Sequence, residues 1–134
     1  MASPYEALAR EAYDALNRRD LEGWANAFHS DVEATSLIME ADGVEYRGRE
    51  GMRKLAEDMI TVFGDYRVEL KELHDVAEDT VVARVHVSGT GDESGIPIEV
   101  DFWGAGWVRD GLFWKGHFYR TEAEALAAIR AESG

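Results

Sequence analysis

The sequence predicts an α+β domain with a mostly antiparallel sheet, and two observations predict this class. Apolar residues recur three or four positions apart as far as Phe63, and from Tyr66 onward they alternate with polar residues. The first spacing places side chains on one face of a helix, whereas alternation places them on one face of a strand. Helices that precede consecutive strands are typical of the α+β class. The 134 residues fit one domain, residues 1–134, because domains commonly hold about 100–150 residues.

Three helices are expected in the first half of the chain. Residues 5–18 have apolar side chains at helical spacing and follow Ser3, a residue type that often begins a helix. Asp20 can cap a second, short helix that buries Trp24. Residues 49–63 place methionine, leucine and phenylalanine side chains on one face, which predicts the third helix.

Strands are expected on both sides of the third helix. They are predicted at residues 32–39, from Tyr66 through Val68 and Leu70, and at residues 80–88, 97–108 and 112–120. The glycine-rich segment 89–95 is typical of a loop between two strands, and residues 109–111 of a hairpin turn. Residues 121–124, with the pattern Thr-x-x-Glu, match a capping box and predict a final helix.

Composition excludes several classes of function. The 14 Lys and Arg against 27 Asp and Glu give a formal net charge of −13, with no basic cluster for a phosphate backbone or an anionic membrane surface. We therefore expect neither nucleic acid nor a membrane as a partner. The absence of cysteine excludes disulfides, thiol catalysis and thiolate metal sites. The chain lacks a signal-peptide pattern and an apolar run of the ~20 residues that span a membrane, so a cytoplasmic location is expected.

Four short motifs occur in an order that resembles a known family. They are Asn17-Arg18-Arg19-Asp20-Leu21, Phe28-His29-Ser30-Asp31-Val32, Tyr46-Arg47-Gly48-Arg49-Glu50-Gly51 and Arg109-Asp110-Gly111. In this order and spacing the chain resembles the SnoaL-like branch of the nuclear transport factor 2-like superfamily, over nearly its whole length. The resemblance implies the ketosteroid isomerase-like fold, a curved sheet wrapped around three N-terminal helices to form a cone with an apolar pocket. It also implies a homodimer formed through the outer face of the sheet.

The resemblance does not determine the activity, because this superfamily contains isomerases, dehydratases, cyclases, epoxide hydrolases and noncatalytic binding proteins. The catalytic aspartate, tyrosine and second aspartate of the ketosteroid isomerases fall on Ser36, on Ala12 and near Gly104 of this chain. A hydroxyl does not abstract a carbon-bound proton as a carboxylate does, and the other two positions carry no functional group. Steroid isomerisation of that type is therefore not expected.

Strand alternation indicates which side chains face the pocket. Val100 and Phe102 are expected inside, together with Gly104 and Gly106. Glycines at these positions either leave room for a ligand or allow the sheet to bend. On the last strand, alternation places Trp114, Gly116 and Phe118 inside and Lys115, His117 and Tyr119 outside.

These faces define an expected set of ligand-binding residues. The set comprises Tyr13, Trp24, Ser36, Met59, Phe63, Phe102 and Phe118. Tyrosine and tryptophan combine a large apolar face with one polar tip, which suits a mostly apolar ligand. Ordinary core packing is the alternative role for these side chains, above all for Trp24.

Asp101 and His117 are the candidate catalytic residues. A carboxylate on a late strand acts as an acid or base in related cyclases, but Asp101 shares its strand face with Glu99 and Trp103, which favours a solvated outer charge. His117 would reach the pocket if the strand register differed by one residue. No histidine pair has the spacing of a helical metal site, so neither a metal nor a cofactor is expected.

The expected function is the binding of a small, largely apolar organic molecule. The protein would then be a cofactor-independent acid/base enzyme of isomerase, cyclase, dehydratase or hydrolase type, or alternatively a noncatalytic binding or interaction domain. A homodimer is expected as well. Trp103, Trp107 and Tyr119 on the outer face would form an exposed apolar patch in a monomer, and such patches usually mark an interface.

Overall fold

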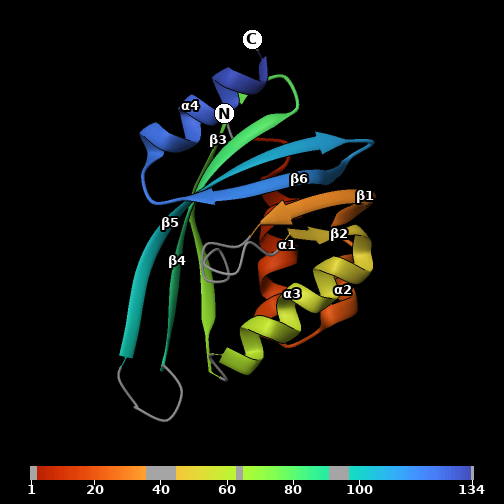
Figure 1. Ribbon diagram of the computed structural model, residues 1–134, viewed down its shortest axis with the longest axis vertical. Coiled ribbons are helices and arrows are strands. Elements are labelled where there is room, and N and C mark those ends of the chain that lie inside the picture. The colour runs from red at the N-terminus through yellow and green to blue at the C-terminus, as the bar shows by residue number, and fades with distance from the viewer. Residues whose placement is uncertain (1–2, 36–44, 63–64, 91–96, 134) are drawn as a thin grey trace.

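The computed structural model describes residues 3–35, 45–62, 65–90 and 97–133 of the chain. The elements in chain order are α1 (Glu6–Asn17), α2 (Leu21–Ala25), β1 (Phe28–Thr35), β2 (Glu45–Arg47), α3 (Gly48–Val62), β3 (Arg67–Ala77), β4 (Thr80–Thr90), β5 (Pro97–Arg109), β6 (Leu112–Tyr119) and α4 (Glu122–Ser133). Figure 1 shows the helices α1, α2 and α3 together on one side of a curved sheet, with α4 set apart from them.

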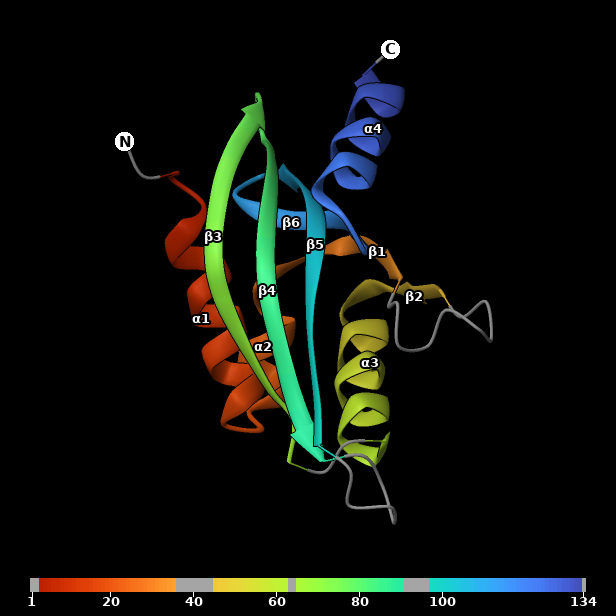
Figure 2. The same ribbon diagram turned by 90° about the vertical axis from the view of Figure 1, so that its left-hand side faces the viewer.

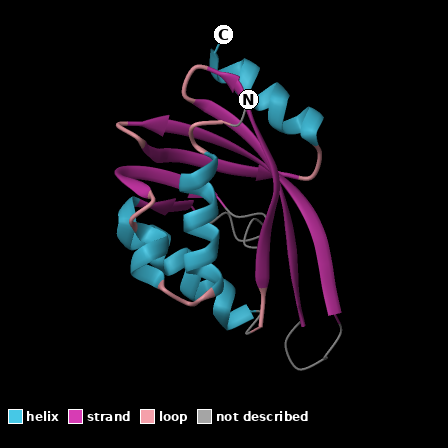
Figure 3. Ribbon diagram, turned by 180° about the vertical axis from the view of Figure 1, so that it is seen from behind, coloured by secondary structure: helices cyan, strands magenta, loops and turns pink. Residues whose placement is uncertain are grey.

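One six-stranded sheet has the strand order β2-β1-β6-β5-β4-β3. Every neighbouring pair is antiparallel except β1 and β6, which run parallel. The long strands β3, β4 and β5 bend along their length, so the sheet curves around the N-terminal helices (Figures 2 and 3). The predicted α+β class, a curved and mostly antiparallel sheet around three N-terminal helices, is confirmed.

Two of the helix caps follow directly from sequence. The Asp20 carboxylate accepts a hydrogen bond from the backbone N–H of Gly23 at 3.0 Å and so caps α2. The Thr121 hydroxyl accepts one from the N–H of Glu124 at 3.1 Å, as a capping box requires at the start of α4. The first helix differs, because its N-cap position is Tyr5 and no side chain caps it.

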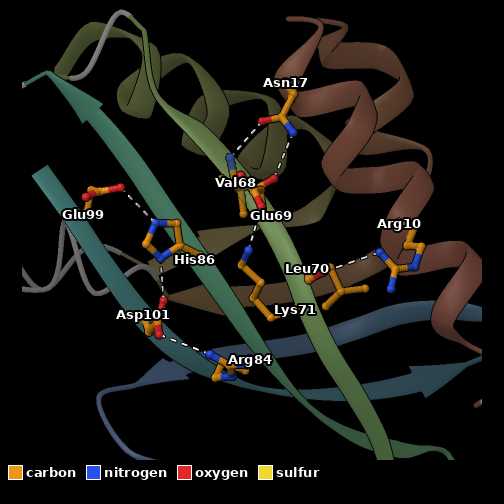
Figure 4. Close-up of polar contacts among 10 residues, drawn as sticks. All are labelled: Arg10, Asn17, Val68, Glu69, Leu70, Lys71, Arg84, His86, Glu99 and Asp101. Atoms are coloured by element: carbon orange, nitrogen blue, oxygen red, sulfur yellow. Dashed lines mark hydrogen bonds and ion pairs between the residues drawn. The ribbon is translucent and has the colours of Figure 1, made fainter.

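Helix α1 covers the free edge of the sheet along β3. The Asn17 side-chain amide donates to the carbonyl oxygen of Val68 at 2.9 Å, and its oxygen accepts from the Val68 N–H at 2.9 Å (Figure 4). Arg19 donates to the carbonyl oxygen of Tyr66 at 2.9 Å. An uncovered edge strand presents unpaired backbone groups to other chains, so these side chains both anchor the helix and protect the edge.

The main core lies between these helices and the inner face of the sheet. It contains the fully buried side chains of Val32, Met52, Tyr66 and Val85. Alternate residues of β4 and β5 contribute to it, and Val100 and Phe102 pack against it as expected. A Cβ atom built on Gly104 would meet the ring of Phe118 of this core, so the glycine also faces inward.

A second, smaller core forms on the opposite face of the sheet, beneath α4. Ala125 and Ile129 of α4 pack with Val82, Ala105 and Trp107 of the sheet. The expectation that Trp107 is exposed in a monomer is therefore wrong, because the final helix leaves this side chain only 9% exposed. The sequence predicted this helix but not the surface that it covers.

The structure also corrects one side-chain direction. Trp114 was expected inside, but it packs against the second core, with the Arg109 guanidinium 4.1 Å from its ring centroid. The pairing of β5 and β6 shifts register between Trp107 and Val108, where a bulge interrupts the alternation. Gly116, Phe118 and the outward set Lys115, His117 and Tyr119 lie beyond the bulge, and they follow the expected pattern.

Candidate ligand-binding site

A cavity opens between the N-terminal helices and the inner face of the sheet. It is lined by Tyr13, Leu16, Trp24, Leu55, Ala56, Met59, Val68, Val85, Val87, Phe102 and Phe118, and we name it the aromatic chamber. Its large side chains come from α1, α2, α3 and four strands, so the curvature of the sheet positions the whole site. Phe102 and Phe118 meet in an edge-to-face contact with ring centroids 6.5 Å apart.

Tyr13 supplies the polar tip of this chamber. Burial raises the pKa of its phenol well above the usual value, so the hydroxyl stays protonated and able to donate. Among the described residues, nothing forms a hydrogen bond with this hydroxyl. The other polar tip is already occupied, since the Trp24 indole N–H donates to the carbonyl oxygen of Met52 at 2.9 Å. The described lining thus offers an apolar ligand one free hydrogen-bonding group.

A second cavity adjoins the first one, and we name it the glycine chamber. It is lined by Ala9, Ala12, Tyr13, Trp24, Phe28, Leu73, Val81, Ala83, Gly104, Ala105, Gly106, Phe113, Lys115, Gly116, His117 and Phe118. Its distinguishing feature is the number of small residues in the walls, on α1 as well as on β5 and β6. Tyr13, Trp24 and Phe118 border both chambers.

Asp101 lies on the outer face of the sheet, away from both chambers. Its carboxylate is 2.6 Å from His86 Nδ1 and accepts a hydrogen bond from Arg84 at 3.4 Å (Figure 4). The hydrogen bond with His86 lowers the pKa of Asp101 and raises the pKa of His86. Glu99 is largely in solvent, and Asp101 and Arg84 are partly exposed, so this is a surface charge network rather than an enclosed acid/base pair.

The His117 imidazole is directed toward the second core. Its ring lies 6.1 Å from that of Trp107, in an edge-to-face contact. Partial burial is the main cause of the lowered pKa of His117, and the nearby Lys115 ammonium adds to it. His117 is one of the residues that line the glycine chamber, while its ring contacts Trp107 of the second core.

Five of the seven expected ligand-binding residues come together around the aromatic chamber: Tyr13, Trp24, Met59, Phe102 and Phe118. Ser36 and Phe63 lie outside the described residues. Sequence reasoning missed the six residues that complete the lining, although helical spacing and strand alternation gave the signal: Leu16, Leu55, Ala56, Val68, Val85 and Val87. Within the described part of the chain, no three His, Asp or Glu side chains are grouped as a metal ion requires. None of the helices described is long and apolar enough to cross a membrane.

Residues 9–116 match the family model of the SnoaL-like domain, so the chain belongs to the SnoaL-like family. No curated protein matches its sequence.

Solved structures show the same fold at low sequence identity. TerC, co-crystallised with polyporic acid, is 23% identical with a TM-score of 0.75, and the match covers 96% of this chain and 99% of that one. A Catenulispora acidiphila protein of ketosteroid isomerase-like fold, in complex with trimethylamine, is 16% identical with a TM-score of 0.76 over 91% of both chains. A Mycobacterium tuberculosis protein in complex with estradiol-17beta-hemisuccinate is 19% identical with a TM-score of 0.73, covering 90% of this chain and 96% of that one.

Proposed function

We propose that this SnoaL-like protein binds a small, neutral, largely apolar organic molecule in the aromatic chamber. The observation that carries the proposal is an apolar lining with one free polar tip, the Tyr13 hydroxyl. Trp24, Met59, Phe102 and Phe118 would hold the ligand by apolar and aromatic contact, while Tyr13 would donate to one acceptor atom. Ser36 and Phe63 are included among the proposed ligand-binding residues on the basis of the sequence alone.

The absence of charge in the described lining supports a neutral ligand. An ionised ligand would lose its hydration without gaining a partner, and that loss costs several kcal/mol. The similar structures support the binding of a small organic molecule, because TerC was crystallised with polyporic acid and the Mycobacterium tuberculosis protein with estradiol-17beta-hemisuccinate.

Binding is favoured over acid/base catalysis by Asp101 or His117. A general base must come within hydrogen-bond reach of the proton it removes, at about 2.6–3.2 Å. The Asp101 carboxylate is held on the outer face by His86 and Arg84, and the His117 ring packs on Trp107. Each group is therefore separated from a ligand in the aromatic chamber by the thickness of the sheet.

The proposal includes a homodimer formed through the outer face. Helix α4 covers Trp107, but Trp103, Trp114 and Tyr119 remain only partly buried around it. These aromatic side chains form the apolar area from which a partner copy would exclude water. Light scattering at micromolar concentration tests this assembly, and the mass of a single 15.0 kDa chain would overturn it.

A matched pair of substitutions tests the binding site. Val87→Phe adds a ring at the wall of the aromatic chamber, whereas Val76→Phe makes the same change at an exposed position of β3. Calorimetric titration with naphthalene, a neutral apolar probe, should give a dissociation constant at least tenfold weaker for Val87→Phe. Val76→Phe should bind as the unmodified protein does. Equal binding by both variants would place the probe elsewhere and refute the site.

A further inference from the structure

The two chambers differ in a way that specifies the shape of a ligand. The aromatic chamber has a volume of about 50 Å³ and walls of large side chains. The glycine chamber is larger, at about 80 Å³, and its walls are made largely of alanine and glycine. Tyr13, Trp24 and Phe118 border both, so the two chambers lie side by side.

Packing explains two of the three glycines in the second chamber. A Cβ atom on Gly104 would approach Phe118 Cε1 to 3.0 Å. On Gly106 it would approach Val81 Cγ2 to 3.3 Å and Phe113 Cε1 to 3.4 Å. The contacts with Phe118 and Val81 would be shorter than ordinary ones, so these glycines give room to the neighbouring side chains.

Gly116 has no such role. A Cβ atom there would have the Ala105 carbonyl oxygen as its nearest neighbour, at 4.0 Å, and the backbone of Gly116 is not in the left-handed region. An alanine would therefore fit at this position without a close contact, and a residue with a side chain favours a strand more than glycine does. The missing side chain therefore leaves open space on the inner face of β6, at the wall of the glycine chamber.

The free hydrogen-bond donor belongs to a side chain that borders both chambers. Tyr13 borders both chambers, and its ring stacks obliquely on Trp24 with centroids 5.9 Å apart. The charged groups of the glycine chamber point elsewhere, since the Lys115 ammonium pairs with Glu132 of α4 at 2.6 Å. A ligand that spans the junction thus meets aromatic rings at one end, a hydroxyl in the middle and small apolar residues at the other end.

We infer that the ligand is an elongated neutral molecule with three parts: an aromatic or similarly flat ring in the aromatic chamber, an oxygen acceptor at the Tyr13 hydroxyl, and an unbranched apolar tail under Gly116. This inference rests on the proposed function and adds to it the chemical class of the ligand. Gly116 sets the accepted length and width of the tail. Tyr13 selects for an acceptor such as a ketone.

A series of phenyl alkyl ketones of increasing tail length tests the inference, with naphthalene as the probe that has neither acceptor nor tail. Dissociation constants come from calorimetric titration. For the unmodified protein, affinity should rise by about fourfold with each methylene buried, as expected for roughly 0.8 kcal/mol per group, until the chamber is full. In Gly116→Val the rise should stop at a shorter tail, while naphthalene binding should not change.

Two further variants complete the design. Ser88→Val places the same side chain on the outer face of β4 and should leave the dissociation constants of the whole series unchanged. If Gly116→Val does not fold, Gly116→Ala replaces it and should have a smaller effect in the same direction. Tyr13→Phe should weaken ketone binding roughly three- to tenfold, the value of one hydrogen bond, and spare naphthalene.

The outcomes separate the two proposals. If naphthalene binds but ketones gain nothing from a longer tail, or if Gly116→Val keeps the same length limit, the inference about the ligand is wrong and the binding function stands. If neither naphthalene nor any ketone binds, the proposed function itself is refuted, and the inference falls with it.

Discussion

The imidazole of His86 lies 2.6 Å from the carboxylate of Asp101, on the face of the sheet that faces away from Phe102 and the aromatic chamber. Neighbouring residues on β5 thus serve different purposes, since Asp101 belongs to a surface charge network and Phe102 to the cavity wall. The functional consequence is that titration of this pair and ligand binding should be independent.

Asp101→Asn should lower the pKa of His86, because the hydrogen bond with Asp101 is the first cause of its raised value. The pair is fully charged only between the lowered pKa of Asp101 and the raised pKa of His86. Its contribution to stability is lost as pH rises through the His86 pKa and as pH falls through the Asp101 pKa. An NMR titration of the histidine ring checks the pKa, and unchanged naphthalene affinity checks the independence. An altered affinity would connect this pair to the cavity.

His117→Gln should remove one source of acid sensitivity. Because burial lowers the pKa of His117 in the folded state, the unfolded chain binds its proton first as pH falls below about 6.5. The free energy of unfolding should therefore decrease from that pH down to the lowered pKa, and this slope should become shallower in the variant. Urea unfolding across this pH range measures it. His74→Gln, the same change at an exposed site, should retain the slope, and equal slopes in all three proteins would contradict the burial of His117.

Asn17→Asp should destabilise the fold by about 1–3 kcal/mol, the usual cost of leaving a buried polar group without its partner. The substitution replaces the amide that donates to the Val68 carbonyl with a carboxylate that cannot donate. Urea unfolding gives the difference. Asn26→Asp at the exposed end of α2 makes the same chemical change without that contact and should cost far less. Similar losses at both positions would mean that Asn17 does not anchor the β3 edge.

Removal of α4, by ending the chain at Thr121, should cause self-association. The truncation uncovers Val82, Ala105 and Trp107, which together form an apolar surface on a six-stranded sheet. Light scattering should report a larger mass than that of the full-length protein under the same conditions. Arg130→Ala, at an exposed position of the same helix, should leave the mass unchanged. A truncated chain with the full-length assembly state would show that α4 does not shield this surface.

Strand alternation was enough to orient most of the site. The single charged residue between Val100 and Phe102 identifies the inner and outer faces of β5. His86, which alternates with the apolar residues of β4, identifies the outer face of that strand. The structure has the same faces. Alternation failed at Trp114 because a bulge is a change of pairing between two strands, and the sequence of one strand carries no signal of it.

The sequence also could not predict which element covers the outer face of the sheet. The apolar residues around Trp107 were recognised, but periodicity does not say whether a helix of the same chain or another molecule covers them. The short strand β2 was also missed, since Glu45–Arg47 is too brief for a pattern. The void beneath Gly116 depends on what its neighbours do not fill, which only the packed structure reveals.

The parallel pairing of β1 with β6 joins segments from opposite ends of the chain, with Phe28 beside Phe113. On the ribosome, β1 emerges early and must wait for β6, the last strand to be synthesised, before its second edge is paired. Until then that edge is open to other nascent chains, and contacts of such long sequence separation form slowly. Phe118 of β6 is also a wall shared by both chambers. The proposed ligand-binding cavity is therefore complete only after β6 has been synthesised and has paired with β1.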